Sequence, residues 1–88
     1  MALNDSLWEF PVHYPMKVMG RADGALKERL TEIILRYVAD FDASTYQVRP
    51  SSKGKYVSFS TTLYLTEKSQ VEGLYADLND CEDVLWAL

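Results

Sequence analysis

The sequence predicts a small α+β protein of the ferredoxin-like type: a four-stranded antiparallel sheet with two helices on one of its faces. Three observations lead to this prediction. The 88 residues are enough for one hydrophobic core and too few for two. Segments with strand or helix periodicity follow one another in the order β-α-β-β-α-β. Each helical segment has a single apolar stripe, so both helices are expected to pack on the same face of the sheet.

An N-terminal extension, residues 1–11, is expected to precede a single domain, residues 12–88. The extension contains Leu7, Trp8 and Phe10, and these apolar side chains predict that part of it packs on the domain.

The first strand is predicted at residues 14–20, where the side chains alternate with the period of two that a strand requires. Pro15 lacks a backbone donor, so we expect it at the start of the strand. The residues from Gly20 to Gly24 form the loop that follows.

The first helix is predicted at residues 24–41. Asp23 is placed to cap its N-terminus, where a carboxylate accepts an unpaired backbone N–H and favours the helix dipole. Glu32 and Arg36 lie off the apolar stripe at a spacing that favours an ion pair, so the outer face is expected to be solvated. The stripe consists of Leu26, Leu30, Ile33, Ile34, Tyr37, Val38 and Phe41.

The second strand is predicted at residues 46–51. Because Pro50 lacks a backbone donor, this strand is either an edge strand or ends at Pro50. A turn follows at residues 51–54, where Gly54 is free to adopt a positive φ. The third strand, residues 55–66, shows the clearest alternation in the chain, with an apolar side and a hydroxyl-rich side.

The second helix is predicted at residues 67–79, with Thr66 or Ser69 as its cap. Ser69 and Glu72 have the spacing of a capping box. A short last strand, residues 84–88, completes the sheet. The apolar stripe of this helix consists of Val71, Leu74, Tyr75 and Leu78.

A ferredoxin-like sheet usually has the strand order 4-1-3-2, and its second face is left open because both helices lie on the first. This open face is a natural place for a ligand or a dimer contact. It is expected to carry Lys17, Met19, Tyr56, Ser58, Ser60, Thr62, Tyr64 and an alternate set from the last strand.

The composition argues against several classes of function. The formal net charge of −4 disfavours nucleic-acid binding, which depends on neutralising phosphates. Cys81 is the one cysteine, which suits a reducing compartment, and the N-terminus has no signal-peptide pattern, so we expect a cytoplasmic protein. No apolar run is long enough to cross a bilayer, and we expect no membrane partner.

The sequence contains no catalytic or metal-binding constellation, and we predict neither an enzyme nor a cofactor. His13 and Cys81 have no third group to form a nucleophilic site, and the acidic residues after position 76 lack the calcium-loop spacing. RNA recognition would require aromatic side chains on the third strand at positions held by Lys55, Val57 and Ser60. Acylphosphatase chemistry needs a glycine-rich phosphate loop, of which Gly20 and Arg21 are only a faint trace.

Several segments together resemble the YbeD-like family of small uncharacterised bacterial proteins. They are Phe10-Pro11, Lys17-Val18-Met19-Gly20, Pro50-Ser51-Ser52-Lys53-Gly54-Lys55-Tyr56 and Val71-Glu72-x-Leu74-Tyr75-x-x-Leu78. The resemblance implies an ACT-like fold, the fold of regulatory modules that sense amino acids through the loop after the first strand. It also implies a link to lipoate or amino-acid metabolism.

The leading hypothesis is therefore a non-enzymatic regulatory module of the ACT-like type that binds a small anionic or amino-acid-like ligand. The loop after the first strand is one candidate site, and the basic turn, where amides and lysines could hold an anion, is the other. The alternative is a protein-interaction adaptor that uses the open face or an edge strand, as a homodimer or with another protein. The candidate residues are Gly20, Arg21, Asp23 and Gly24 in the loop, and Ser51, Ser52, Lys53 and Gly54 in the turn.

Overall fold

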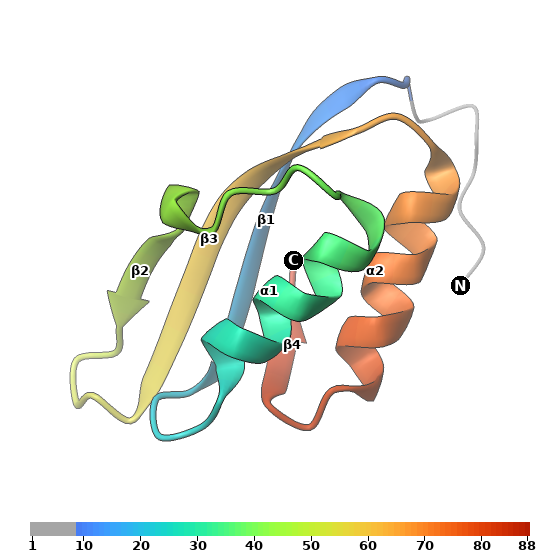
Figure 1. Cartoon of the computed structure of the whole chain (residues 1–88). Helices are drawn as coiled ribbons and strands as arrows, with labels where there is room; N and C mark the ends of the chain where they lie inside the picture. Colours follow the sequence, from blue (N-terminus) through green and yellow to red (C-terminus); the bar gives the residue numbers. More distant parts are fainter. Residues whose placement is uncertain (1–8) are drawn as a thin grey trace.

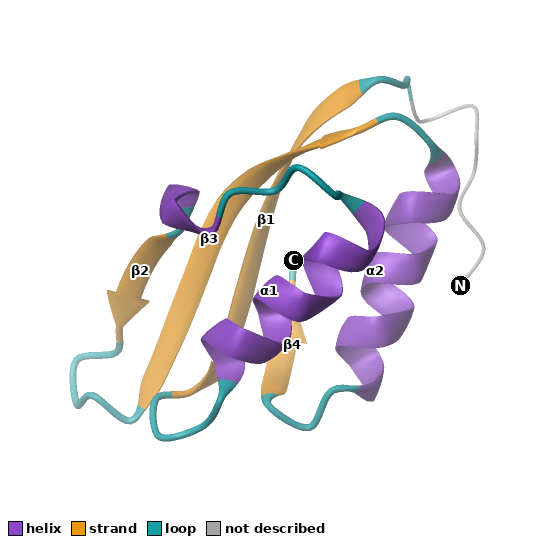
Figure 2. Ribbon diagram, in the orientation of Figure 1, coloured by secondary structure: helices purple, strands orange, loops and turns teal. Residues whose placement is uncertain are grey.

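In the computed structural model, which describes residues 9–88, the elements follow one another in the predicted order (Figures 1 and 2). The apolar residues Leu7 and Trp8 of the predicted extension lie outside the described residues, and the division of the chain at residue 11 stays a prediction. The elements are β1 (Val12–Arg21), α1 (Leu26–Tyr37), a 3₁₀ turn (Ala43–Thr45), β2 (Gln47–Pro50), β3 (Tyr56–Leu65), α2 (Lys68–Asp80) and β4 (Val84–Ala87).

The four strands form one antiparallel sheet in the order β2-β3-β1-β4, which confirms the predicted topology. β1 and β3 are paired along their whole length, from Val12 opposite Leu65 to Arg21 opposite Tyr56. Both helices cover the same face of the sheet, and β2 extends beyond them at one side (Figure 1). Among residues 9–88, no helix covers the opposite face, as the sequence predicts.

The core lies between the helices and the sheet. It is made from the alternate strand residues and helix stripes that the periodicity identifies. Val38 is fully part of this core although α1 ends one residue before it, and Phe41 packs against it from the following turn. The buried apolar residues are Met16, Val18, Leu26, Leu30, Ile33, Ile34, Val38, Phe59, Leu63, Leu65, Val71, Leu74 and Leu78.

The prediction that Pro15 begins the first strand is wrong. Pro15 lies within β1, opposite Thr62. The backbone N–H and C=O of Lys17 are both hydrogen-bonded to Leu88, so the backbone polar groups of Lys17 point toward the β4 side of β1. Along a strand, the backbone polar groups of every second residue point to the same side. The nitrogen of Pro15 therefore points to the same side as that of Lys17, at a position beyond the end of β4. No strand needs a donor there, and the proline is accommodated inside the strand.

A bulge interrupts the pairing of β4 with β1. Met19 lies opposite Trp86, and the next residue, Gly20, lies opposite Val84, so Leu85 is the additional residue. Val84 and Ala87 both pack against the core. The additional residue allows Leu85 and Trp86 to be exposed side by side, with exposed fractions of 51% and 38%.

The N-terminus of α1 differs from the prediction. The helix begins at Leu26 with Ala25 as its N-cap, and Asp23 makes an ion pair with Arg21 at 3.3 Å instead of capping it. The carboxylate that lies at this end comes from the loop before β4. Asp83 Oδ1 accepts a long hydrogen bond, 3.5 Å, from the backbone of Ala25.

The predicted capping box of Ser69 and Glu72 is also wrong. Gln70 Oε1 accepts hydrogen bonds from the backbone nitrogens of Thr66 (2.7 Å) and Glu67 (3.0 Å) at the start of α2. Its Nε2 donates to the carbonyl of Tyr37, the last residue of α1, at 2.7 Å. One side chain thus satisfies backbone groups at the start of one helix and at the end of the other.

Candidate ligand-binding face of the sheet

The loop after β1 is largely engaged in its own structure. Gly20 is buried within the strand, where a side chain would overlap the carbonyl oxygen of Asp83, so its glycine is required by close backbone packing. Arg21 and Asp23 are exposed and pair with each other. The amide of Gly24 donates to the carbonyl of Arg21. Whether a ligand uses these four residues stays a prediction.

The basic turn is also closed by internal hydrogen bonds. The Ser51 amide donates to the carbonyl of Tyr56, and the Gly54 amide donates to the carbonyl of Ser51. Ser51 Oγ accepts from the amide of Tyr56, and Gly54 has the predicted positive φ, 70°. Two of the amides proposed to hold an anion are therefore occupied within the turn. Ser52 and Lys53 are exposed.

The fold brings these two segments to the same end of the molecule (Figure 1). Arg21 lies opposite Tyr56 in the sheet, and the amide of Ala22 donates to the carbonyl of Lys55 at 2.9 Å. The cations Arg21, Lys53 and Lys55 therefore lie at the same end, although Arg21 precedes the two lysines by more than thirty positions in the chain.

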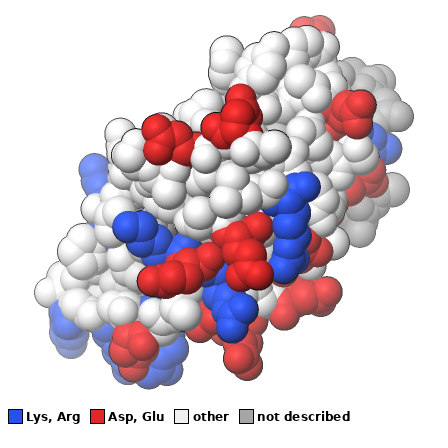
Figure 3. Space-filling view, viewed as in Figure 1, with Lys and Arg blue, Asp and Glu red and all other residues white. Residues whose placement is uncertain are grey.

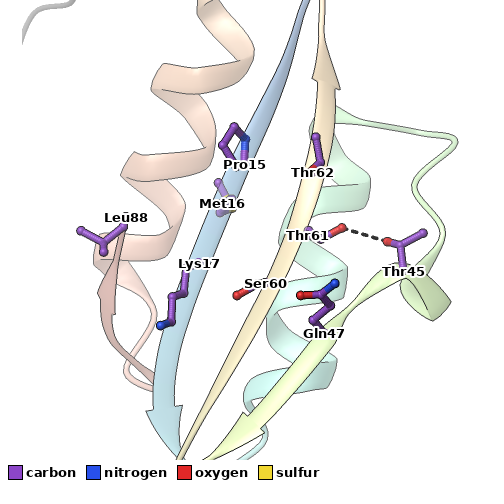
Figure 4. A pocket seen from close by; sticks show the side chains of 9 residues that line it. All are labelled: Pro15, Met16, Lys17, Thr45, Gln47, Ser60, Thr61, Thr62 and Leu88. Carbon is purple, nitrogen blue, oxygen red and sulfur yellow. Dashed lines mark hydrogen bonds between the residues drawn. The ribbon is translucent and has the colours of Figure 1, made fainter.

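A cavity of about 350 Å³ lies farther along the sheet, beside the end of β4. Lys17, Ser60 and Gln47 form one row across β1, β3 and β2, and the Gln47 side chain points toward Ser60 (Figure 4). The hydroxyls of Thr45 and Thr61 are hydrogen-bonded to each other at 2.8 Å at its side. The lining residues are Pro15, Met16, Lys17, Thr45, Gln47, Ser60, Thr61, Thr62 and Leu88 (Figure 4).

The chemistry of this lining is cationic, hydroxyl-rich and free of carboxylate side chains. Lys17 supplies an ammonium group with three donors, and Ser60, Thr62 and Gln47 supply further polar groups. Pro15 and Leu88 add an apolar border. Such a set of donors suits a small ligand with anionic oxygens and a short apolar part.

The helix side of the molecule has the opposite character. Acidic and basic side chains are interspersed over the helices (Figure 3). Arg36 pairs with Glu32 at 3.7 Å, as predicted, and with Asp77 at 3.2 Å. Arg29 pairs with Glu32 and with Asp83, at 3.8 and 3.9 Å. A hollow of about 450 Å³ lies among these residues, and the mutual pairing of its charges indicates a structural role.

The titratable groups whose pKa is shifted lie outside the cavity. Burial raises the pKa of Tyr75, whose hydroxyl is hydrogen-bonded to that of Tyr14 at 2.8 Å. A backbone hydrogen bond from Ser44 lowers the pKa of Asp42. The rings of His13 and Tyr64 contact each other at a tilt of 49°, with centroids 5.0 Å apart. Within residues 9–88, no group of three His, Cys, Asp or Glu side chains is arranged to hold a metal ion.

A family model described as a protein of unknown function, DUF493, matches residues 5–88. The chain belongs to the DUF493 family. This confirms the resemblance to the YbeD-like proteins. DUF493 relatives include a UPF0250 protein of Edwardsiella ictaluri, 41% identical over 85 residues that cover 96% of this chain and 94% of the relative. A UPF0250 protein of Nitrosomonas europaea is 36% identical over 76 residues, covering 86% of this chain and 87% of the relative.

The solution structure of protein HP0495 from H. pylori has the same fold as this DUF493 chain. The TM-score is 0.66, with 14% sequence identity, and the match covers 92% of this chain and 85% of that one. At this identity the likeness shows the fold alone. Among the described residues, no helix is long and apolar enough to span a membrane.

The sequence predicts the sheet face of three lining residues, but the loop and turn residues predicted as sites do not line the cavity. Lys17, Ser60 and Thr62 were assigned to the open face by strand alternation, and the structure places all three in its lining. Thr45 and Gln47 were missed, because the link between α1 and β2 has no periodic pattern that would orient them. The position of Gln47 depends on the register of β2 against β3, which places it opposite Ser60.

Proposed function

We propose that this DUF493 protein is a non-enzymatic regulatory module that binds a small anionic metabolite on the open face of its sheet. The observation that supports the proposal is the cavity itself. Its lining combines the Lys17 ammonium with hydroxyl and amide groups and contains no carboxylate side chain to repel an anion. The module would act in the cytoplasm, without a cofactor, in amino-acid or lipoate metabolism.

The ligand class follows from the size and border of the cavity. A volume of about 350 Å³ lies in the range of small-molecule sites. A carboxylate would face Lys17 and Ser60, and a short aliphatic chain would lie against Pro15 and Leu88. Amino acids and medium-chain carboxylates, including lipoate and octanoate, satisfy both conditions.

A thermal-shift screen against amino acids, lipoate, octanoate, nucleotides and phosphate tests this function. A ligand at about a hundred times its Kd stabilises the folded state by ~2.7 kcal/mol. For a small domain, each kcal/mol raises Tm by roughly 4–8 °C. The Lys17→Met variant is expected to lose the shift, whereas Lys27→Met, on the exposed surface of α1, is expected to keep it.

The two variants separate a specific site from general electrostatic attraction, because each removes one exposed positive charge. A flat screen, or a shift that survives in Lys17→Met, would contradict the proposal. Phosphatase activity of the purified protein above that of a heat-inactivated control would contradict its non-enzymatic part.

A protein-interaction adaptor is the second candidate function. The exposure of Leu85 and Trp86 on an edge strand favours it, because neighbouring exposed apolar side chains often mark interaction sites. Both functions can coexist, since the cavity and these two residues occupy different parts of the open face.

A further inference from the structure

The open face of the sheet has a second region, below the cavity in the direction of the basic turn. Met19 lies opposite Trp86 on one side and Ser58 on the other, and Ser58 lies opposite Arg49. These four residues form one row across all four strands. The next row of this face pairs Arg21 with Tyr56. Tyr56 is the first residue of β3 and directly follows the turn that carries Lys53 and Lys55.

One end of this region is apolar. Leu85 and Trp86 are exposed side by side because of the bulge, and Met19 lies half-buried next to them. Ser58 is only 4% exposed although no helix covers this face, so the larger side chains around it exclude water. Tryptophan is among the residues that most often anchor a protein partner.

The other end of this region has positive charges without acidic partners. Within residues 9–88, no carboxylate lies within ion-pair distance of Arg49, Lys53 or Lys55, and Arg21 contacts only Asp23. On the helix side, by contrast, Arg29 and Arg36 each have two carboxylate partners. Among the described residues, three of the cations that make no ion pair, Arg49, Lys53 and Lys55, thus lie toward the β2 edge of the sheet, across from Leu85 and Trp86 on β4.

We infer that this region, consisting of Met19, Arg21, Arg49, Lys53, Lys55, Tyr56, Leu85 and Trp86, docks an acidic, amphipathic segment of another protein. Carboxylates of the partner would face Arg21, Arg49 and the turn lysines, and its apolar side chains would cover Leu85 and Trp86. This charge complementarity guides encounter and fixes orientation, while the apolar anchor supplies the larger share of the affinity.

A single-stranded nucleic acid fits the same surface less well. Leu85 and Met19 are aliphatic and offer no ring for a base to stack on.

The test is a titration of the full chain with three short fluorescent peptides, followed by anisotropy and by amide chemical shifts. The peptides alternate Glu with Leu, Glu with Ser, and Lys with Leu. The Glu-Leu peptide is expected to bind and to shift the amides around Met19, Arg49, Tyr56 and Trp86. The Glu-Ser peptide should bind more weakly, and the Lys-Leu peptide should not bind.

Substitutions at the two ends of the region provide the second readout. We expect Trp86→Ala to lower the affinity for the Glu-Leu peptide by roughly tenfold or more. We expect a decrease of the same size for the double variant Arg49→Glu, Lys53→Glu. Lys27→Glu, a charge reversal on α1, should leave the affinity unchanged. The amide spectrum of each variant verifies that the sheet is still folded.

Three results would overturn the inference. They are shifts confined to the helices, equal binding of the Glu-Leu and Lys-Leu peptides, and tighter binding of an oligothymidine than of the Glu-Leu peptide. A failed metabolite screen would leave the inference standing, because none of the eight residues of the docking region lines the cavity.

Discussion

At the scale of single residues, Gly20 is the position where the chain tolerates least change. Its Cα lies against the backbone of Asp83, and a methyl group there would also approach Leu26 to 2.8 Å. Gly20→Ala is expected to destabilise the fold by about 1–3 kcal/mol, because the backbone of the β4 entry must move. Urea denaturation measures this loss, with Gly54→Asn as the control at a glycine that has open space and a φ that Asn adopts. Equal losses in both variants would contradict the packing argument.

A second prediction at this scale concerns Tyr75 and the pH dependence of stability. Burial raises its pKa above the ordinary value of 10.0, so the folded state keeps the phenolic proton after the unfolded state has lost it. Its contribution to stability is therefore complete below pH 10 and decreases as the pH rises above 10. Denaturation followed between pH 8 and pH 11 should show this decrease, and Tyr75→Phe should show a smaller one. An identical slope in the variant would assign the decrease to other groups.

At the scale of elements, the two helices are joined by a polar contact as well as by the core. Gln70 links the start of α2 to the carbonyl of Tyr37 at the end of α1. Gln70→Ala is expected to cost about 1–3 kcal/mol, because it removes an accepting cap and leaves a half-buried carbonyl without its donor. Ser69→Ala, which removes the cap that the sequence suggests, should cost less than ~0.5 kcal/mol. Thermal unfolding of both variants decides between the two caps, and a larger loss for Ser69→Ala would refute the structural assignment.

The same elements show how far a sequence determines a fold of this kind. The alternation along β3 and the stripes of both helices predicted which residues form the core, because burial imposes its period on the chain. Pro15 and Asp83 were misjudged or missed for a common reason. Each is explained by a segment distant in the sequence: the end of β4 for Pro15 and the Gly20–Ala25 segment for Asp83. The bond from Gln70 to the carbonyl of Tyr37 is equally distant, whereas its cap on Thr66 and Glu67 is a local pattern that the sequence reading overlooked. Local propensity contains no information about the distant contacts.

At the scale of the whole molecule, charge is distributed by face. The helix side pairs its arginines with carboxylates, whereas the open face of the sheet and the adjoining turn carry cations with few acidic neighbours. The candidate sites could be predicted only in part, because the sequence shows which residues share a strand face but not the register in which neighbouring strands pair. The loop and the turn, predicted as two separate sites, lie at one end because Arg21 pairs with Tyr56.

The pairing of β1 with both β3 and β4 also bears on how the chain folds. The strand that is synthesised first has as its neighbours the two strands that are synthesised last, and the Val12–Leu65 pair closes a loop of more than fifty residues. Contacts of such long sequence separation must overcome a large loop-closure entropy before they contribute stability. On the ribosome, the backbone of the first strand therefore has no neighbouring strand to pair with until most of the chain has emerged. Folding of this protein is consequently expected to be a late and concerted event rather than a progressive assembly from the N-terminus.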